Sequence, residues 1–447
     1  MKPTLRPISN QLQLFQSHFD QLLNPSHPLI VLAKKIDWNR FQVALQDCYS
    51  PDLGAPAKSV RLIVGLLYLK HAFNLSDELV LQRWVENPYW QYFCGFETMQ
   101  HEAPIHPTSL TKWRNRVGAQ RLSVMLQETI DLAVKAGEVN KQELAQVTID
   151  TTVQEKNITY PTDSKLYHRA ITKLARAAGL RGVKLRQSYV RVAKHAAIQA
   201  GRYAHAKQFK RMRRVLNKMR TWLGRLLRDI GRKVPSPDAM FSSLLERCQR
   251  LHAQQSTDKK KLYSLHEPDV QCISKGKARQ RYEFGQKVAL AITNRGNWIV
   301  GVEVFTDNPY DGHTLSKSIE VTEKMTGVKV AAAYVDKGYR GHDYRGEASV
   351  QISGSSNRSV SASLCKRRRR RSAIEPKIGH LKRENRLDRC YLSGLAGDRI
   401  NAILAAASSN LLKLLRALAP ALEKTLIGWH VLAIWRSKSL RTEVQPA

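Results

Sequence analysis

The sequence predicts a mixed α/β protein, with a sheet covered by helices and preceded by an all-helical region. Segments rich in β-branched residues recur between about residues 146 and 353, and helical patterns lie before, between and after them. A long and very basic helical segment interrupts these strands. The 447 residues are 43% hydrophobic, which is enough to build real cores and excludes a globally disordered chain.

The charge of the chain is strongly positive. Lys and Arg number 73 against 37 Asp and Glu, a formal net charge of +36. Such a chain calls for a polyanionic partner, and nucleic acid is preferred over an anionic membrane surface. The six cysteines form no C-x-x-C pair, so neither a disulfide framework nor a zinc ribbon is expected. The sequence shows no secretory signal and no apolar run of membrane-spanning length, so we expect a cytoplasmic protein without a membrane partner.

Residues 1 to about 140 are predicted to be helical throughout. Helices are expected over residues 59–73 and 79–86, the second after a Ser-Asp-Glu start. A third is expected in the basic segment SLTKWRNRVG, with Ser109 as its N-cap and Gly118 at its end. This arrangement indicates a helix-turn-helix-like DNA module, and an all-helical packing domain is the alternative. The candidate DNA contacts are Lys112, Arg114 and Arg116.

Three strands are expected in the first half of the sheet. The first covers residues 146–152, QVTIDTT, and is rich in β-branched residues. Two more, residues 284–293 and 298–305, are separated by the turn sequence Asn-Arg-Gly-Asn, which predicts a hairpin.

The second half adds a parallel-type strand and helical cover. A helix over residues 314–325, ended by Gly327, precedes the apolar segment 328–336, which we expect to be a strand buried on both faces. A short strand is expected at residues 349–353, and helices from about Arg370 onward. This order of elements predicts a mixed sheet with helices packed on it.

Residues from about 165 to 262 are expected to form a basic helical insert within the sheet. Between Lys207 and Lys233, eleven Lys or Arg residues stand against one acid, Asp229. Apolar residues at helical spacing give this segment one hydrophobic side, typical of a helix that lies along phosphates or on a membrane. A helical hairpin with a solvated face is the alternative. Phosphate contacts are expected from Lys210, Arg211, Arg213 and Arg214.

Three acids are placed where metal ligands would be expected. Asp150 lies within the first strand, Asp336 ends the apolar strand, and Glu375 follows a run of arginines. Two or three converging carboxylates bind hard cations such as Mg²⁺, and two such ions can activate a water or a 3′-hydroxyl against a phosphodiester. Structural roles are the alternatives: a local turn at Asp150, an Asx turn at Asp336, and a capping box from Ser372 to Glu375.

Five segments with these acids and their neighbours occur in a characteristic order: VTIDTTV, SLHEPDVQCISKGK, NPYDGHTL, YVDKGYRGH and RRRSAIEPKIGHLK. Over roughly residues 145–415 they resemble the DDE transposases of bacterial insertion sequences, in the insertion-sequence-five-like group, which is related to the insertion-sequence-four group. The resemblance implies a ribonuclease H-like core in which Asp150, Asp336 and Glu375 form the catalytic, metal-binding triad. It implies Mg²⁺, or Mn²⁺ in its place, as the cofactor.

The family pattern around the third acid is Y-x2-R-x3-E-x6-K. Arg371 and Lys382 match it, whereas Arg368 stands at the Tyr position. At 100° per residue, Arg371, Glu375 and Lys382 would share one helix face, so the two cations are expected to bind DNA phosphates beside the metal. Pro376 predicts either a bend in this helix or a helix start near Glu375.

Two further residues match the family pattern without an assigned role. Asp311 and His313, in NPYDGHTL, could support the site or take part in catalysis. The expected domains are a terminal-repeat-binding domain at 1–140, a catalytic domain at 141–415 containing the insert, and a helical tail at 416–447.

The resemblance implies a transposase that cleaves the ends of its own element and joins the 3′ ends to target DNA by two-metal phosphoryl transfer. A nuclease of the same fold without strand transfer is one alternative, and a non-catalytic DNA-binding protein derived from a transposase is another. The expected partners are double-stranded DNA, as terminal inverted repeats and as target, and a second copy of the chain in the active complex. The expected location is the bacterial cytoplasm, in association with the nucleoid.

Overall fold

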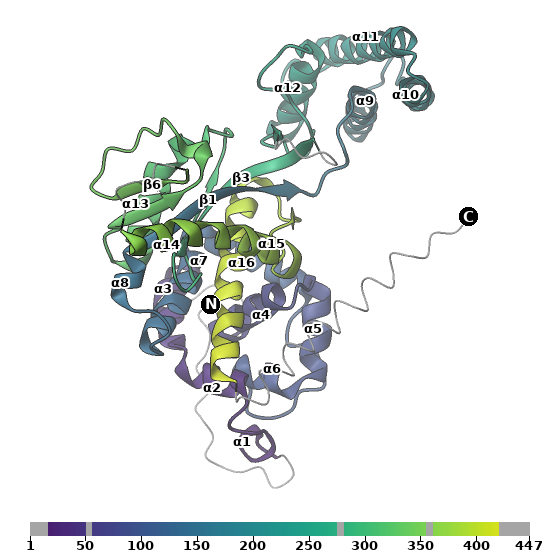
Figure 1. The fold of residues 1–447 in the computed structure, drawn as a ribbon. Coiled ribbons are helices and arrows are strands. Elements are labelled where there is room, and N and C mark those ends of the chain that lie inside the picture. Colours follow the sequence, from purple (N-terminus) through teal and green to yellow (C-terminus); the bar gives the residue numbers. More distant parts are fainter. Residues whose placement is uncertain (1–16, 51–55, 275–280, 355–360, 420–447) are drawn as a thin grey trace.

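A seven-stranded mixed sheet forms the centre of the molecule, as seen in a computed structural model that describes residues 17–50, 56–274, 281–354 and 361–419 (Figure 1). The neighbours in the sheet follow the order β2-β3-β1-β5-β6, with β4 also paired to β3 and β7 to β1. β3 runs antiparallel to both β1 and β4. β5 runs parallel to β1, and β6 runs parallel to β5. The strands are β1 (Gln146–Lys156), β2 (Gln271–Ser274), β3 (Tyr282–Thr293), β4 (Ile299–Phe305), β5 (Ala332–Val335), β6 (Ser349–Ile352) and β7 (Arg389–Cys390).

The five predicted strands are present with changed lengths, since β1 continues to Lys156 rather than ending at residue 152, and β2 and β7 were not predicted. β3 and β4 form the expected hairpin, and β6 lies where a short strand was expected. The apolar segment 328–336 contributes only four residues to the sheet. Its first residues bond instead to helix side chains, since the Val328 backbone N–H donates to Thr326 Oγ1 and that of Val330 to Glu323 Oε1. Side-chain acceptors therefore replace a neighbouring strand over this part of the segment.

The N-terminal region is helical, as predicted. Ser59 and Ser76 cap two of its helices through the backbone N–H groups of Leu62 and Leu79. Its helices are α1 (Phe19–Leu22), α2 (Pro28–Lys35), α3 (Trp38–Leu45), α4 (Val60–Ala72), α5 (Asp77–Glu86), α6 (Pro88–Phe93), α7 (Pro107–Lys135) and α8 (Lys141–Leu144), with a 3₁₀ turn, η1 (Gln46–Cys48).

The predicted bounds of the third helix were wrong. α7 begins at Pro107 with His106 as its cap, and it resumes after a kink at Gly118, whose φ is +75°. The chain continues as a helix because the next turns carry a second apolar face, including Leu122, Met125 and Leu126, that is fully buried. Gly118 therefore changes the direction of the helix without ending it.

The last helices complete the cover of the sheet. They are η2 (Asp311–Thr314), α13 (Leu315–Thr326), η3 (Lys337–Tyr339), α14 (Ala362–Arg370), η4 (Arg371–Ala373), α15 (Ile374–Glu384) and α16 (Gly394–Leu418). Gly327 ends α13 with φ +68°, as predicted. α15 begins at Ile374, so Pro376 lies in the first turn, where its missing N–H breaks no hydrogen bond. A helix start near Glu375 was one of the two predicted outcomes.

One hydrophobic core joins the N-terminal helices to the sheet. The buried cluster includes Leu66 of α4, Leu126 of α7, Ile149 of β1 and Leu404 of α16. α16 packs against both α4 and α7 as well as against β4. The expected boundary at residue 140 therefore does not separate two cores, and the expected tail boundary at 415 falls within α16. The tail beyond residue 419 lies outside the described residues.

The insert has a hydrophobic core of its own. It projects from the end of β1 as a separate group of helices (Figure 1). The basic helix lies where it was predicted, and its apolar side, including Met219, Leu223 and Ile230, is buried inside the insert rather than open to a membrane. None of the helices in the described part of the chain is long and apolar enough to span a bilayer. The helices of the insert are α9 (Asp163–Leu180), α10 (Val190–His205), α11 (Phe209–Lys233) and α12 (Ala239–Ala253).

Candidate active site

Asp150 lies in the middle of β1, between two neighbouring strands. β3 pairs with β1 along one edge, with Leu290 opposite Asp150, and β5 pairs with the other edge up to Thr148, two residues before Asp150. Its Oδ1 accepts a hydrogen bond from the Thr151 backbone N–H at 2.7 Å, and the side chain is 16% exposed. A carboxylate this enclosed needs a cation or hydrogen-bond donors beside it.

Asp336 follows directly after β5, and the strand register brings it to Asp150. β5 is parallel to β1, and Thr148 lies opposite Tyr334. Two residues further along each chain segment, Asp150 and Asp336 are therefore side by side. Asp336 Oδ1 accepts a hydrogen bond from the Gly338 backbone N–H at 2.9 Å. The Asx turn considered from the sequence is therefore present, and it leaves the second carboxylate oxygen for the site.

Glu375 reaches the two aspartates from the first turn of α15. Arg371, one turn earlier in η4, donates Nη1 to Glu375 Oε1 at 2.8 Å and Nη2 to Asp150 Oδ2 at 3.1 Å. The same Nη2 lies 3.7 Å from Asp336 Oδ2. One guanidinium thus contacts all three acids, so three carboxylates from distant parts of the sequence meet around a single point.

The donor set at this point suits a divalent cation. Mg²⁺ prefers carboxylate oxygens, and the three side chains are 16%, 36% and 61% exposed, which leaves a path from solvent. Within the described residues, no three His, Cys, Asp or Glu side chains already stand together as a metal cluster. The acids are arranged around the Arg371 guanidinium, so a divalent ion that bound here would take over its neutralising role.

Of the cations at the family-pattern positions around Glu375, one contacts the three acids and the others lie elsewhere on α14 and α15. Arg371 contacts the acids, while Lys382 lies half-buried in the last turn of α15. Arg368, at the family's Tyr position, donates Nη2 to Gln351 Oε1 on β6 at 2.9 Å, so it fastens α14 to the edge of the sheet. The capping box at Ser372 is absent, because that hydroxyl donates to the backbone carbonyl of Arg369, within the preceding turn.

A fourth acid, Asp311, braces the strand beside Asp150. Its Oδ1 accepts hydrogen bonds from Thr151 Oγ1 at 2.8 Å and from the nearly buried Lys287 Nζ at 2.9 Å. Burial, followed by the charges of nearby acids including Asp150, raises the pKa of Tyr339.

Lys287 was not predicted as a site residue. It is the only cation in the apolar run FGQKVALAIT, and a lone charge in such a run is a feature that could have indicated it. His313 is exposed at the surface.

One predicted DNA contact was wrong. Arg114 is only 1% exposed and donates Nη1 and Nη2 to the two carboxylate oxygens of Asp77 at 2.9 and 2.6 Å. Lys70 donates to the same carboxylate at 2.7 Å. Burial alone would raise the pKa of Asp77, yet these two cations lower it well below its usual range. Lys112 and Arg116 are exposed, as are the four predicted contacts of α11, Lys210, Arg211, Arg213 and Arg214.

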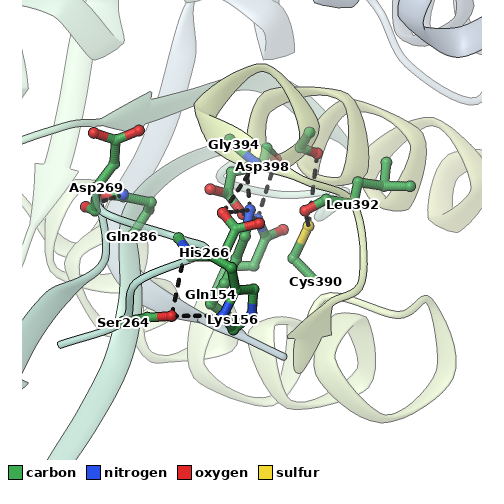
Figure 2. Close-up of polar contacts among 12 residues, drawn as sticks. Gln154, Lys156, Ser264, His266, Asp269, Gln286, Cys390, Leu392, Gly394 and Asp398 are labelled. Atoms are coloured by element: carbon green, nitrogen blue, oxygen red, sulfur yellow. Dashed lines mark hydrogen bonds and ion pairs between the residues drawn. The ribbon is translucent and has the colours of Figure 1, made fainter. Parts of the chain in front are cut away.

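A buried polar cluster holds the insert to the sheet where the chain enters and leaves it (Figure 2). Lys156, the last residue of β1, lies 2.9 Å from Asp398 Oδ1 of α16 and 3.3 Å from Glu267 Oε2, in the segment returning from the insert. Gln154 donates to Asp398 as well, and Glu267 Oε2 accepts from the backbone N–H of Gly394 at 3.0 Å. Burial raises the pKa of Asp398, although Lys156 opposes the shift. The sequence did not predict this cluster. The motif SLHEPDVQ, which contains Glu267, is the feature that could have indicated it.

Comparisons with known proteins place parts of the chain in two families. A family model described as "Transposase domain (DUF772)" matches residues 17–116, and one described as "Transposase DDE domain" matches residues 250–411. The second match includes Asp336 and Glu375 and begins after Asp150. These two matches identify the class of the protein as a transposase with a DDE domain. The chain belongs to the DDE transposases, with the two-domain make-up typical of the families of insertion sequences four and five.

A relative of this chain has no assigned role. "Uncharacterized protein ORF8 in nfe locus" of Rhizobium meliloti is 50% identical over 209 residues, which are 47% of this chain and 100% of that protein. No solved structure matches the chain. The DDE domain implies a phosphoryl-transfer enzyme with a ribonuclease H-like core, and the mixed sheet described above is consistent with that.

Proposed function

We propose that this chain cleaves DNA at the ends of its own mobile element and joins the freed 3′ ends to target DNA. The observation that supports this best is the meeting of Asp150, Asp336 and Glu375 around one point in a chain with a net charge of +36. Acids alone would repel a DNA backbone. A site of this kind therefore works on phosphodiesters only when cations offset its charge.

The residues divide the chemical work among them. Asp150 and Asp336 would hold the divalent ions, and Glu375 would complete their ligands. When bound, such ions lower the pKa of an attacking water or 3′-hydroxyl and stabilise the leaving oxygen. Asp311 keeps the strand beside Asp150 in place, and Arg371 is a proposed phosphate contact once its carboxylate partners are neutralised.

Binding of DNA would rest on cations away from the triad. The exposed Lys and Arg residues of α11 stand on a helix group that projects from the sheet, where a duplex can lie along them. Lys112 and Arg116 offer a second surface on α7. We propose that these surfaces hold the terminal inverted repeats, that Lys382 contacts phosphate near the triad, and that a second copy of the chain brings the two element ends together.

The test is Mg²⁺-dependent nicking of a labelled element end by Asp150→Asn, Asp336→Asn and Glu375→Gln. Each substitution keeps the shape of the side chain and removes the charge that holds a hard cation. Cleavage should fall by on the order of 10³-fold or more, while DNA binding persists. Asp163→Asn, an exposed acid at the start of α9, is the control and should cut normally.

The outcomes separate the possible functions. If one triad variant cuts at the wild-type rate, that residue is not a ligand. If the wild-type chain nicks DNA but never joins the 3′ end to a second duplex under any divalent ion, a nuclease is the better description. If it binds DNA and cuts none, the chain is a binding protein.

A further inference from the structure

A cleft beside the triad is lined by polar and cationic side chains that no part of the proposed function uses. Its volume is about 450 Å³, and it lies between α14, the β3–β4 turn and α8. The lining residues from α14 are Ser363, Lys366, Arg367 and Arg370, and those from the other walls include Asn140, Glu143, Gln146, Asn294 and Arg295.

One face of α14 provides the cations. Ser363, Lys366, Arg367 and Arg370 are spaced i, i+3, i+4 and i+7, so they form a single stripe along the helix. Arg295 joins them from the hairpin turn with a side chain that is 73% exposed. Glu143 is the single acid in the lining, and it lies 3.6 Å from Arg295. The cleft therefore carries a clear excess of positive charge.

The walls of the cleft are held by hydrogen bonds that leave most of these cations available. Arg367 Nη1 donates to Gln146 Oε1 at 2.9 Å, and Asn294 Nδ2 donates to the backbone carbonyl of Arg367 at 3.1 Å. These bonds join α14 to the start of β1 and to the hairpin turn. Among the described residues, no carboxylate forms an ion pair with Lys366 or Arg370. Arg367 shapes the site, and Lys366 and Arg370 present charge within it.

The cleft is connected to the triad in two ways. Arg370 directly precedes Arg371, which contacts all three acids. Asn294 also donates to Thr148 Oγ1 at 3.1 Å, and Thr148 lies two residues before Asp150, on the same face of β1. Gln146 begins β1, whereas the insert leaves from its other end, after Lys156. The cleft and the insert therefore lie on opposite sides of the triad.

We propose that this cleft binds the phosphodiester backbone of the DNA on the side of the cleaved bond away from the insert. Gln146 lies four residues before Asp150 along β1, about 13 Å away at the usual rise of a strand. That distance is the axial length of roughly four nucleotides in a duplex. The phosphates that bind here therefore lie within about four nucleotides of the cleaved bond. This inference rests on the proposed function for the identity of the DNA.

The experiment compares the full-length chain with Lys366→Gln, Arg370→Gln and Arg295→Gln. The probe is labelled duplex DNA from the flank of the chain's own coding region, bound without divalent metal over a salt series. Each substitution that removes a phosphate contact should reduce the slope of log affinity against log salt by about 0.9, and the triple variant should approach three times that reduction. Lys324→Gln, an exposed cation of α13 outside the cleft, is the matched control and should leave the slope unchanged.

Neutral methylphosphonates in the DNA locate the bound phosphates. Placed one at a time within about four nucleotides of the cleaved bond, they should weaken wild-type binding at one or two positions and leave binding by the triple variant unaffected, since both changes remove the same interaction. Equal slopes for all variants, or equal methylphosphonate effects on the wild type and the triple variant, would overturn the proposal. Wild-type nicking in Mg²⁺ is scored separately. If the wild type fails to nick while the variant slopes still fall, the proposed function is wrong and the cleft still binds DNA.

Discussion

The N-terminal region and the insert are both helical, and each contains a basic segment that suggested a separate DNA-binding unit. They differ in how they bury their apolar side chains. α4 is buried on nearly every side and shares one core with the sheet and α16. α11 is buried along one stripe, and that stripe closes a core inside the insert. The sequence pattern thus shows that a segment is helical and basic. Whether the segment can fold by itself depends on which part of the chain packs against its apolar face.

The largest effect should come from cutting the two regions out of the chain. A fragment of residues 1–140 loses α16 and the sheet, and the apolar faces of α4 and α7 become exposed. We expect it to aggregate or to unfold without a cooperative transition. A fragment of residues 160–268 keeps the whole buried cluster of the insert and should unfold cooperatively. Circular dichroism during heating checks both fragments. A stable 1–140 fragment that binds DNA would contradict the conclusion that the N-terminal helices need the sheet and α16 to fold.

Asp77→Asn should give the largest effect of a single substitution. It leaves Arg114, which is fully buried, and Lys70 without their shared carboxylate. Burial, followed by the charge of Arg114, lowers the pKa of Lys70 to about 8, so these cations already depend on Asp77. The free energy of unfolding should fall by about 3–5 kcal/mol, as measured in urea.

Asp238→Asn in the insert is the matched control for this substitution. Asp238 pairs with Arg181 at 2.7 Å, but that pair is largely exposed. The new Asn can still accept the N-cap hydrogen bond from Phe241. We expect only a small loss of stability, much smaller than at Asp77, because solvent screens an exposed pair. Similar losses at Asp77 and Asp238 would show that the two regions bury their ion pairs equally, contrary to the structure.

Acid should weaken the shared core through His71, between α4 and α16. Burial, followed by the charge of Lys70, lowers the pKa of His71 well below its ordinary value. The folded chain therefore resists the proton that the unfolded chain accepts near pH 6.5, so stability is present above that pH and falls below it. The loss is at most about 1.4 kcal/mol per pH unit. Urea unfolding at pH 7 and 5.5 measures it, and a His71→Gln variant should show a flatter pH dependence.

The smallest effect on stability should follow neutralisation of the exposed side of α11. Changing Lys210, Arg211, Arg213 and Arg214 to Gln removes exposed charges and leaves the buried stripe intact. The melting temperature should stay within a few degrees of wild type. Binding to DNA should weaken with little dependence on sequence, and the salt slope should fall by about 0.9 for each phosphate that is no longer bound. An unchanged slope would mean that this side of α11 only faces solvent.

Local sequence patterns predicted α4, α5, α13 and the β3–β4 hairpin well, because caps, glycines and turn residues act within a few positions of one another. The same patterns failed at Gly118 and in the segment before β5. There, the packing of α7 on α16 and side-chain acceptors on α13 decided where regular structure continued. The first failure depends on a helix far away in the sequence, whereas the second depends on hydrogen bonds to side chains two and seven residues earlier, which no apolar pattern reveals.

The sequence by itself determined the class of fold, the three acids and the excess of positive charge, because these depend on residue types and short-range spacing. Only the tertiary structure decided that Arg114 is buried against Asp77 and that Arg371 contacts all three acids. It also decided that α16, at the end of the described chain, completes the core of the N-terminal helices. Burial and charge pairing depend on what packs from distant parts of the chain, and no local pattern specifies that partner.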